Sequence, residues 1–253
     1  MYHGLNNQVL YSAARITVTF DVEGGEQKSK TGTCFILRVG KPYLVTNRHC
    51  VDLFYKKAER AEFSIKDIEI AGRFWDDELV RSEVHINNVI YSKDYDDDFV
   101  CFENPDIPVF KKKRVENFIP ENLIATEKAY ATLNMCDFLA FPGYPEWYDQ
   151  TGNRPVLRTG NIASDPRFPY KSGDARGDCM AFEAFSTSGS SGSPVFATQV
   201  GIKAGSGLSF EGFRPAYFIG IDAGHLTRPD GHVGISYLYR STAILRAIRG
   251  SDR

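Results

Sequence analysis

Short apolar runs, separated by turn-forming residues, recur along almost the whole chain and constrain its fold more than any other feature. In the first run, Ile16, Val18 and Phe20 alternate onto one face, and glycines at 24 and 25 mark the following turn. Many short strands with little helical periodicity predict β-barrels or a β-sandwich. Similar runs occupy residues 34–39 and 43–46, which are expected to form a hairpin, and residues 62–68, 82–90 and 98–102. A second group of strands is expected to begin near Ala129. It includes residues 137–141, 156–163, 180–185, 194–198, 217–223 and 233–239.

The C-terminal segment has a different pattern. Residues 241–250 begin with a serine, place Ile244, Leu245 and Ile248 at helical spacing, and end at a glycine that follows a cation. We therefore predict a short closing helix. The charged and proline-bearing residues 103–127 are the expected link between two halves of the chain.

The charge composition does not indicate a basic surface that would bind nucleic acid. The chain carries 30 basic and 32 acidic side chains, a formal net charge of −2 at pH 7. Its one dense basic run, from Lys111 to Arg114, is interpreted as a solvated linker. A nucleic-acid partner is therefore not expected.

The sequence shows no targeting or membrane-spanning segment. Residues 1–20 lack a basic start followed by an apolar run and a small-residue cleavage site. No stretch approaches the roughly eighteen apolar residues that would span a bilayer. We expect a soluble, cytoplasmic protein without a membrane partner.

The cysteines predict neither a disulfide framework nor a metal centre. Five are present, an odd number, and no two form a C-x-x-C pair, so reduced thiols are expected. A zinc site that combines His49, Cys50 and the other cysteines is disfavoured, because the ligand spacing of structural zinc sites is absent. We expect no metal and no cofactor.

The run of tiny residues from Ser188 to Ser193, followed by Pro194, is the strongest chemical signal in the chain. So small a turn exposes one hydroxyl beside free backbone N–H groups. Acyl transfer needs this arrangement, because attack on a carbonyl creates an oxyanion that must find donors about 3 Å away. Ser191 is therefore the candidate nucleophile.

A serine hydroxyl needs a base, most often a histidine, and a carboxylate that orients the imidazole. His49 directly follows the apolar run that ends near Thr46, so a rigid strand end could position it. Asp98 directly precedes another apolar run. These two residues are the candidate base and its orienting acid.

The three segments together resemble the trypsin-like serine peptidases of the chymotrypsin fold, in particular their bacterial and intracellular branch. The shared motifs are Thr-x-x-His-Cys at 46–50, an Asp before four apolar residues at 98–102, and Gly-x-Ser-Gly-x-Pro at 189–194. They occur in the family's order, with separations of 49 and 93 residues, and Gly143-Tyr144-Pro145 adds a further likeness. The resemblance covers about residues 30 to 248.

The resemblance implies an all-β fold of two six-stranded antiparallel β-barrels with a short C-terminal helix. The expected N-terminal barrel, residues 1–115, carries His49 and Asp98. The expected C-terminal barrel, residues 116–253, carries Ser191 and the closing helix.

The resemblance also implies a role for each residue in a serine endopeptidase. Ser191 attacks the scissile carbonyl, His49 accepts and returns the proton, and Asp98 holds the imidazole. The N–H groups of Gly189 and Ser191 would form the oxyanion hole. Asp98 is preferred over Asp97 because it is the residue that directly precedes the apolar run.

Two departures bear on activation and specificity. Digestive members carry an Asp before the catalytic Ser, which pairs with a newly cut amino terminus; this chain has Ser190. We infer that proteolytic maturation is not required, and that the oxyanion loop is either preformed or ordered by an activating protein partner. Where basic-selecting members carry an Asp six residues before the nucleophile, this chain has Phe185.

The substrate-binding residues are harder to assign. Residues 220–225 resemble the strand that forms one wall of the specificity pocket and pairs with substrate, which makes Asp222, Ala223 and Gly224 candidates. In that register Asp222 would favour a basic substrate side chain, although it could equally be an ordinary polar strand residue. Gly234 is expected in the facing wall.

Secreted relatives often bridge the Cys after the catalytic His to a Cys on the preceding strand, and Cys34 and Cys50 could occupy those places. In a reducing cytoplasm we expect both to pack as free thiols.

Two alternative functions are compatible with part of the sequence. An α/β-hydrolase would order its triad as Ser191, Asp222 and His232, but the required Gly two residues after the Ser and the strand–helix alternation are absent. A peptide-binding pseudoprotease, with the fold but no catalysis, is the alternative from another functional class. The favoured interpretation is a selective, partner-controlled intracellular endopeptidase that acts on a peptide or protein substrate.

Overall fold

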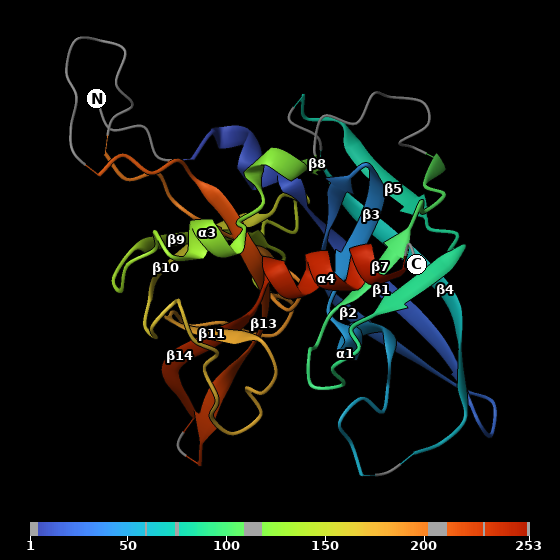
Figure 1. The fold of residues 1–253 in the computed structure, drawn as a ribbon. Coiled ribbons are helices and arrows are strands. Elements are labelled where there is room, and N and C mark those ends of the chain that lie inside the picture. The colour runs from blue at the N-terminus through green and yellow to red at the C-terminus, as the bar shows by residue number, and fades with distance from the viewer. Residues whose placement is uncertain are drawn as a thin grey trace.

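The fold is taken from a computed structural model, which describes residues 5–58, 60–73, 76–108, 118–201, 212–229 and 231–251. Two β-sheets, one from each half of the chain, make up most of it, and Figure 1 shows them side by side. The expected domain boundary at residue 115 and the basic run from Lys111 to Arg114 lie outside the described residues.

The C-terminal half forms a closed barrel of six antiparallel strands. Closure leaves no sheet edge with unpaired N–H and C=O groups. Around the barrel the order is β10 (Val156–Ile162), β11 (Cys179–Glu183), β14 (Gly231–Arg240), β13 (Tyr217–Arg228), β12 (Pro194–Ala197) and β9 (Phe138–Gly143).

The N-terminal half forms an eight-stranded sheet, in which β8 (Phe118–Pro120) pairs in parallel with β2 beside the main path. The all-β fold class is therefore confirmed, and in detail this half has two strands more than the six expected. Along the path the order is β5 (Leu79–Glu83), β4 (Phe63–Arg73), β1 (Ala13–Val22), β2 (Glu26–Val39), β3 (Lys41–Thr46), β7 (Val100–Glu103) and β6 (Asn88–Tyr91).

The sequence pattern failed at two places. The single strand expected at 82–90 is two strands, because β5 pairs with β4 whereas β6 pairs with β7. The strand group expected to begin near Ala129 begins at β9, and Ala129 lies in the short helix α3 (Glu127–Tyr130). The hydroxyl of Thr126 accepts a hydrogen bond from the Ala129 amide, so a side-chain N-cap starts this helix where local apolar pattern suggested a strand.

The two sheets share one hydrophobic core. Phe35 of β2 packs edge-on against Phe218 of β13, with ring centroids 5.2 Å apart. Phe196 of β12 packs on the same Phe218 ring. Burying side chains of this size contributes about 1.5–3 kcal/mol each, so the junction between the halves is a major source of stability.

The closing helix is present as expected, as α4 (Ser241–Ser251), and it contacts β13, β14 and β6. Figure 1 shows it lying across the junction between the two sheets. Ile244 and Ile248 enter the shared core. The Ser241 hydroxyl donates to the Ala125 carbonyl at 2.9 Å. The helix therefore ties the two halves together.

The other helices in the described residues are short: the 3-10 helices η1 (Asn7–Ser12) and η2 (Glu121–Leu123), and one turn, α1 (Arg48–Val51). None of the described helices is both long and apolar enough to cross a membrane.

Candidate active site

His49 lies in the single helical turn α1, directly after β3. Asn47 forms the junction, and its side-chain amide donates to the Asp98 carbonyl oxygen at 2.6 Å. The Lys30 ammonium, from β2, donates to the carbonyl oxygens of His49 and Asp52, at 2.5 and 3.1 Å. The backbone around His49 is therefore held from both sides.

Asp98 binds His49 twice. Its Oδ1 accepts from the His49 amide at 2.9 Å, and its Oδ2 lies 2.5 Å from His49 Nδ1. About a third of the His49 side chain is exposed, against 9% of the Asp98 side chain. A hydrogen-bonded Nδ1 assigns that nitrogen as the donor, so Nε2 is the atom left to act as a base.

The pair shifts the titration of the imidazole. Burial by itself lowers the pKa of His49, but the charge and hydrogen bond of Asp98 outweigh it and raise that pKa well above 6.5. A carboxylate at hydrogen-bond distance favours the charged form of its partner. Asp98 therefore stabilises the imidazolium that general-base catalysis would create.

The neighbouring Asp97 has a different role. Its carboxylate accepts from the Ser92 hydroxyl at 2.7 Å and from the Asp178 amide at 2.8 Å. It binds a loop of the other half of the molecule, whereas the carboxylate that contacts the His49 imidazole is that of Asp98.

Ser191 lies close to the His49 turn. A Cβ placed on Gly32 would stand 2.9 Å from Cys50 Sγ and 3.1 Å from the Ser191 carbonyl oxygen. Cys50, the residue after His49, and the Ser191 carbonyl therefore both lie next to Gly32. Among the described residues, the Ser191 hydroxyl has no hydrogen-bond partner.

Thr33 of β2 attaches the serine loop to the N-terminal sheet. Its amide donates to the Ser191 carbonyl at 2.8 Å, and its hydroxyl donates to the Gly189 carbonyl at 2.8 Å. The same hydroxyl accepts from the Tyr144 amide at 3.0 Å. One fully buried residue thus fixes two carbonyls of the loop, one through its backbone amide and one through its side chain.

The amides of the loop divide into two groups. Those of Ser190, Gly192 and Ser193 donate to the carbonyls of Thr187, Asp222 and Ser190 respectively, at 2.9 to 3.0 Å. For the amides of Gly189 and Ser191, no acceptor is found in the described part of the chain. Among the amides from Gly189 to Ser193, these two N–H groups are therefore the ones available to a ligand.

Glycine is required at two loop positions. Gly189 has φ +84° and Gly192 has φ +93°, both in the left-handed region. A side chain at Gly189 would overlap the Tyr144 carbonyl oxygen, and one at Gly192 would overlap the Thr33 carbonyl oxygen. The Gly and Ser pattern therefore reflects close backbone packing as well as turn geometry.

Asp222 of β13 is fully buried beside the same loop. Its amide donates to the Ser193 carbonyl at 2.9 Å, and its Oδ2 accepts from the Ser186 hydroxyl at 2.8 Å. Its Oδ1 is buried without a hydrogen-bond partner among the described residues. Burial raises the pKa of Asp222 to about 7, although the Ser186 hydroxyl and the Arg158 charge oppose the rise.

The other candidate substrate-binding residues lie near Asp222. The pairing of β13 with β14 shifts register between Asp222 and Gly224, which marks a bulge at Ala223. Phe185 is 65% exposed, and its ring edge lies 3.9 Å from the point where a Cβ on Gly234 would stand. Phe185 and Gly234 are therefore neighbours.

Two residues that hold the loop were missed from the sequence: Thr33 and Arg158. Arg158 of β10 donates through Nη1 to the Ser190 hydroxyl at 2.8 Å. No local signal distinguishes either residue, because each is an ordinary strand residue whose contact lies more than thirty positions away along the chain.

The cysteines are free thiols, four of them buried and Cys136 exposed. Cys34 and Cys50 are not bridged. Burial raises the pKa of the Cys34 thiol, so it stays protonated. Within the described residues, no group of three or more His, Cys, Asp or Glu side chains could hold a metal ion.

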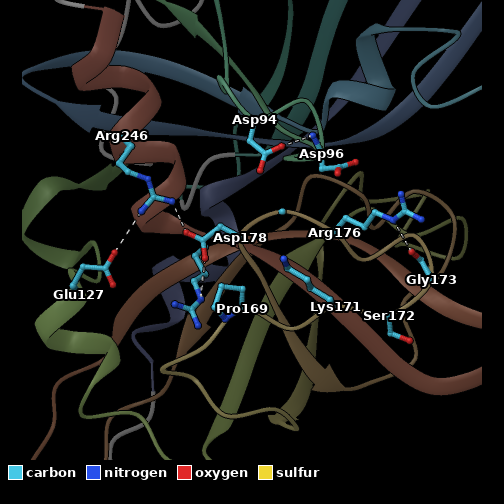
Figure 2. Close-up of a pocket in the computed structure, with 12 residues that line it drawn as sticks. Asp94, Asp96, Glu127, Pro169, Lys171, Ser172, Gly173, Arg176, Asp178 and Arg246 are labelled. Atoms are coloured by element: carbon cyan, nitrogen blue, oxygen red, sulfur yellow. Dashed lines mark hydrogen bonds and ion pairs between the residues drawn. The ribbon is translucent and has the colours of Figure 1, made fainter.

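An open hollow of about 780 Å³ is lined by none of the three candidate catalytic residues. Figure 2 shows that it is surrounded by both acidic and basic side chains. Arg246 pairs with Asp178 at 2.5 Å and with Glu127 at 3.5 Å, and Arg240 also reaches Asp178. These charges neutralise one another, so we assign no ligand to this hollow.

Solved structures of serine proteases have a similar fold. Protease Anisep from Arthrobacter nicotinovorans has a TM-score of 0.59 and 12% identity, over 98% of this chain and 99% of that one. The HtrA-type protease AlgWS227A with tripeptide has a TM-score of 0.58 and 13% identity, and the match covers 96% of this chain but 60% of that one. The thermostable serine protease AL20 has a TM-score of 0.54 and 13% identity, over 95% of this chain and 97% of that one.

No protein-family model matches the sequence, and no curated protein matches it. At these identities the likeness extends to the fold alone. The chain therefore has the fold of chymotrypsin-type serine peptidases, as its motifs predict.

Proposed function

We propose that this protein is a serine endopeptidase in which Ser191 is the nucleophile, His49 the general base and Asp98 the residue that orients His49. The observation that carries the proposal is the 2.5 Å contact between His49 Nδ1 and Asp98 Oδ2, which leaves Nε2 free as a base. The nearby Ser191 loop and its two uncommitted amides support it.

The proposed reaction has two stages. Ser191 Oγ forms a bond to the scissile carbonyl carbon and passes its proton to His49 Nε2, which must come within about 3 Å. The oxyanion accepts hydrogen bonds from the amides of Gly189 and Ser191. The C–N bond breaks as the imidazolium returns the proton to the amine, and water then hydrolyses the acyl-enzyme by the same route.

Covalent labelling tests this proposal directly. A fluorophosphonate probe is expected to attach one equivalent to the wild-type protein at Ser191, and none to the Ser191→Ala variant. His49→Ala should slow labelling by several orders of magnitude, because the hydroxyl loses its base. The rate of peptide cleavage by Ser191→Ala and by His49→Ala is expected to be about 10⁴- to 10⁶-fold lower than that of the wild type.

The same experiment distinguishes the pseudoprotease alternative. That function predicts no labelling of the wild-type protein, with or without cell extract, while the protein stays folded. Equal peptide cleavage by wild type and Ser191→Ala would assign the cleavage to a contaminant.

The proposed substrate has a basic side chain before the cleaved bond, held by Asp222. A buried carboxylate oxygen without a partner is costly, and a guanidinium or ammonium group would satisfy it. Because the pKa of Asp222 is raised to about 7, preference for basic residues should strengthen as pH rises through that value.

Binding of benzamidine, a small arylamidine cation, tests Asp222 without requiring catalysis. Ser191→Ala should bind benzamidine, whereas Ser191→Ala/Asp222→Asn should lose at least about tenfold in affinity, since the ligand loses its charged partner. Equal binding, or cleavage only after apolar residues, would assign the pocket to Phe185 and its neighbours instead.

Control by a protein partner and action in the cytoplasm complete the proposal. Partner control is tested by comparing the fluorophosphonate labelling rate of the purified protein with that in cytoplasmic extract. Partner control predicts faster labelling in extract, and an equal rate argues against it.

A further inference from the structure

The side chain of Arg158 is half-buried beside the Ser191 loop. Its Nη1 donates to the Ser190 hydroxyl at 2.8 Å. Its guanidinium carbon lies 5.1 Å from the centre of the Phe141 ring and 5.6 Å from that of Trp147. In the described part of the chain, Arg158 forms no ion pair with a carboxylate within 4 Å. A partly buried cation is costly without a charged partner, so this placement calls for an explanation.

The group that Arg158 binds lies between the two proposed oxyanion donors. Ser190 is 1% exposed and separates Gly189 from Ser191. Its amide donates to Thr187, and its carbonyl accepts from the Ser193 amide at 2.9 Å. The hydroxyl is the one remaining polar group of Ser190, and Arg158 binds it. All three groups that set the orientation of this residue are therefore held.

A negative charge lies on the other end of the same loop. Asp222 holds Gly192 and Ser193 through its backbone. Although burial lowers the pKa of Arg158, the charge of Asp222 acts to raise it. The ionised form of Asp222 therefore attracts Arg158 across the loop that both residues hold, without a direct ion pair.

We propose that Arg158 is a positioning residue that orders the oxyanion loop through the Ser190 hydroxyl. The loop is then preformed by a cation from the neighbouring strand, and it needs neither a new amino terminus nor an Asp at position 190. The catalytic consequence rests on the proposed function, whereas the ordering itself does not.

Amide hydrogen exchange tests the ordering in the inactive Ser191→Ala protein. Arg158→Met keeps the length and apolar contacts of the side chain but removes the donor and the charge. We expect the amides of Ser190, Gly192 and Ser193 to exchange at least tenfold faster in this variant. Unchanged exchange would overturn the proposal.

A matched control and a second variant separate anchoring from general destabilisation. Arg167→Met removes another arginine that packs on an aromatic ring, at 5.5 Å from Phe168, and it should leave the loop unchanged. Ser190→Ala removes only the acceptor and should reproduce the effect of Arg158→Met. The double variant should show no further increase, because both substitutions break one bond. An additive increase would contradict the proposal.

Kinetics test the consequence for catalysis. Arg158→Met should lower kcat about 10- to 100-fold with little change in KM, since misplaced oxyanion donors act on the transition state. Ser190→Asp should remain active with Arg158 present, because the new carboxylate gains an ion-pair partner. The same substitution in the Arg158→Met protein should abolish activity.

The outcomes for the two proposals are distinguishable. Absence of fluorophosphonate labelling of the wild-type protein would remove the peptidase function, while exchange at Ser190 would still decide whether Arg158 orders the loop. A labelled, active wild type with full kcat in Arg158→Met would overturn the catalytic part of the Arg158 proposal.

Discussion

The two halves of the candidate active site are held in different ways. On the N-terminal sheet, His49 is oriented by one charged side chain, Asp98, which binds both its ring and its amide. On the C-terminal barrel, the Ser191 loop is oriented mainly by neutral hydrogen bonds to its backbone, from Thr33, Asp222 and its own residues, and one cation, Arg158, binds a single loop hydroxyl. The first half depends on the identity of its side chains, and the second on the packing around its peptide groups.

This difference has a consequence for mutation. A charge-assisted pair should fail abruptly when one member is removed, because its chemistry has no substitute. A loop held by several neutral bonds should lose function gradually, since each net contribution is only about 0.5–1.5 kcal/mol.

Among the substitutions that test this comparison, Asp98→Asn should have the largest effect. The substitution keeps the size of the side chain but removes the charge that orients His49, and kcat should fall about 10⁴-fold. Asp97→Asn is the matched control: it removes the adjacent carboxylate, and kcat should change only a few-fold because Asp97 binds Ser92 and Asp178. Comparable losses in the two variants would show that the His49–Asp98 pair has no special role.

Gly189→Ala should have the next largest effect, lowering kcat about 10²- to 10³-fold. The added methyl group would overlap the Tyr144 carbonyl oxygen and displace the Gly189 amide. Gly173→Ala introduces comparable backbone strain at φ +56° without any neighbour within 4 Å, so it controls for the strain alone. The measurement is steady-state cleavage of one peptide by both variants. Full activity in Gly189→Ala would exclude this amide from the oxyanion hole.

Thr33→Val tests the neutral side of the comparison. The variant keeps the shape of Thr33 but leaves the Gly189 carbonyl and the Tyr144 amide without their shared partner. We expect about a tenfold lower kcat and a loss of about 1–3 kcal/mol in the free energy of unfolding. Ser241→Ala removes another buried hydroxyl that donates to a carbonyl, and it should cost stability without lowering kcat. If Ser241→Ala lowered kcat and Thr33→Val did not, Thr33 would have no special role in positioning the loop.

The smallest effect is a displacement of the pH profile. Since Asp98 raises the pKa of His49 well above 6.5, the imidazole should remain protonated to a higher pH than an isolated histidine. Only the neutral form accepts a proton, so kcat/KM should fall as pH drops through that raised pKa. Imidazole NMR titration of the Ser191→Ala protein should show the same pKa, and adding Asp98→Asn should lower it. A His49 pKa of 6.5 or less would contradict the strength of the pair.

The charged half of the site could be predicted from the sequence, and the neutral half only in part. His49, Asp98 and Ser191 stand out because each combines a reactive side chain with a short, unusual neighbourhood. Thr33 and Arg158 do not, because hydroxyls and guanidinium groups are common on strands and their partners lie far along the chain.

Similar reasoning explains the fold. The alternation of residues 14–20 correctly predicts β1 because period two reports a half-buried strand whatever its neighbours are. The prediction of one strand at 82–90 was wrong because strand boundaries depend on pairing partners. Here β5 pairs with β4, whereas β6 pairs with β7. The strand group predicted to begin near Ala129 was wrong because a side-chain N-cap at Thr126 starts a helix there. The apolar residues around Ala129 do not indicate this helix.

The sequence by itself determined the all-β architecture, the closing helix and the choice of three candidate catalytic residues, because these depend on local periodicity and on residue identity. The tertiary structure alone decided that Asp97 binds Ser92 and Asp178, that Asp222 is buried with one oxygen unpartnered among the described residues, and which two loop amides stay uncommitted. Those properties arise from hydrogen bonds between segments distant in the chain, and such bonds exist only once both sheets have packed around their shared core.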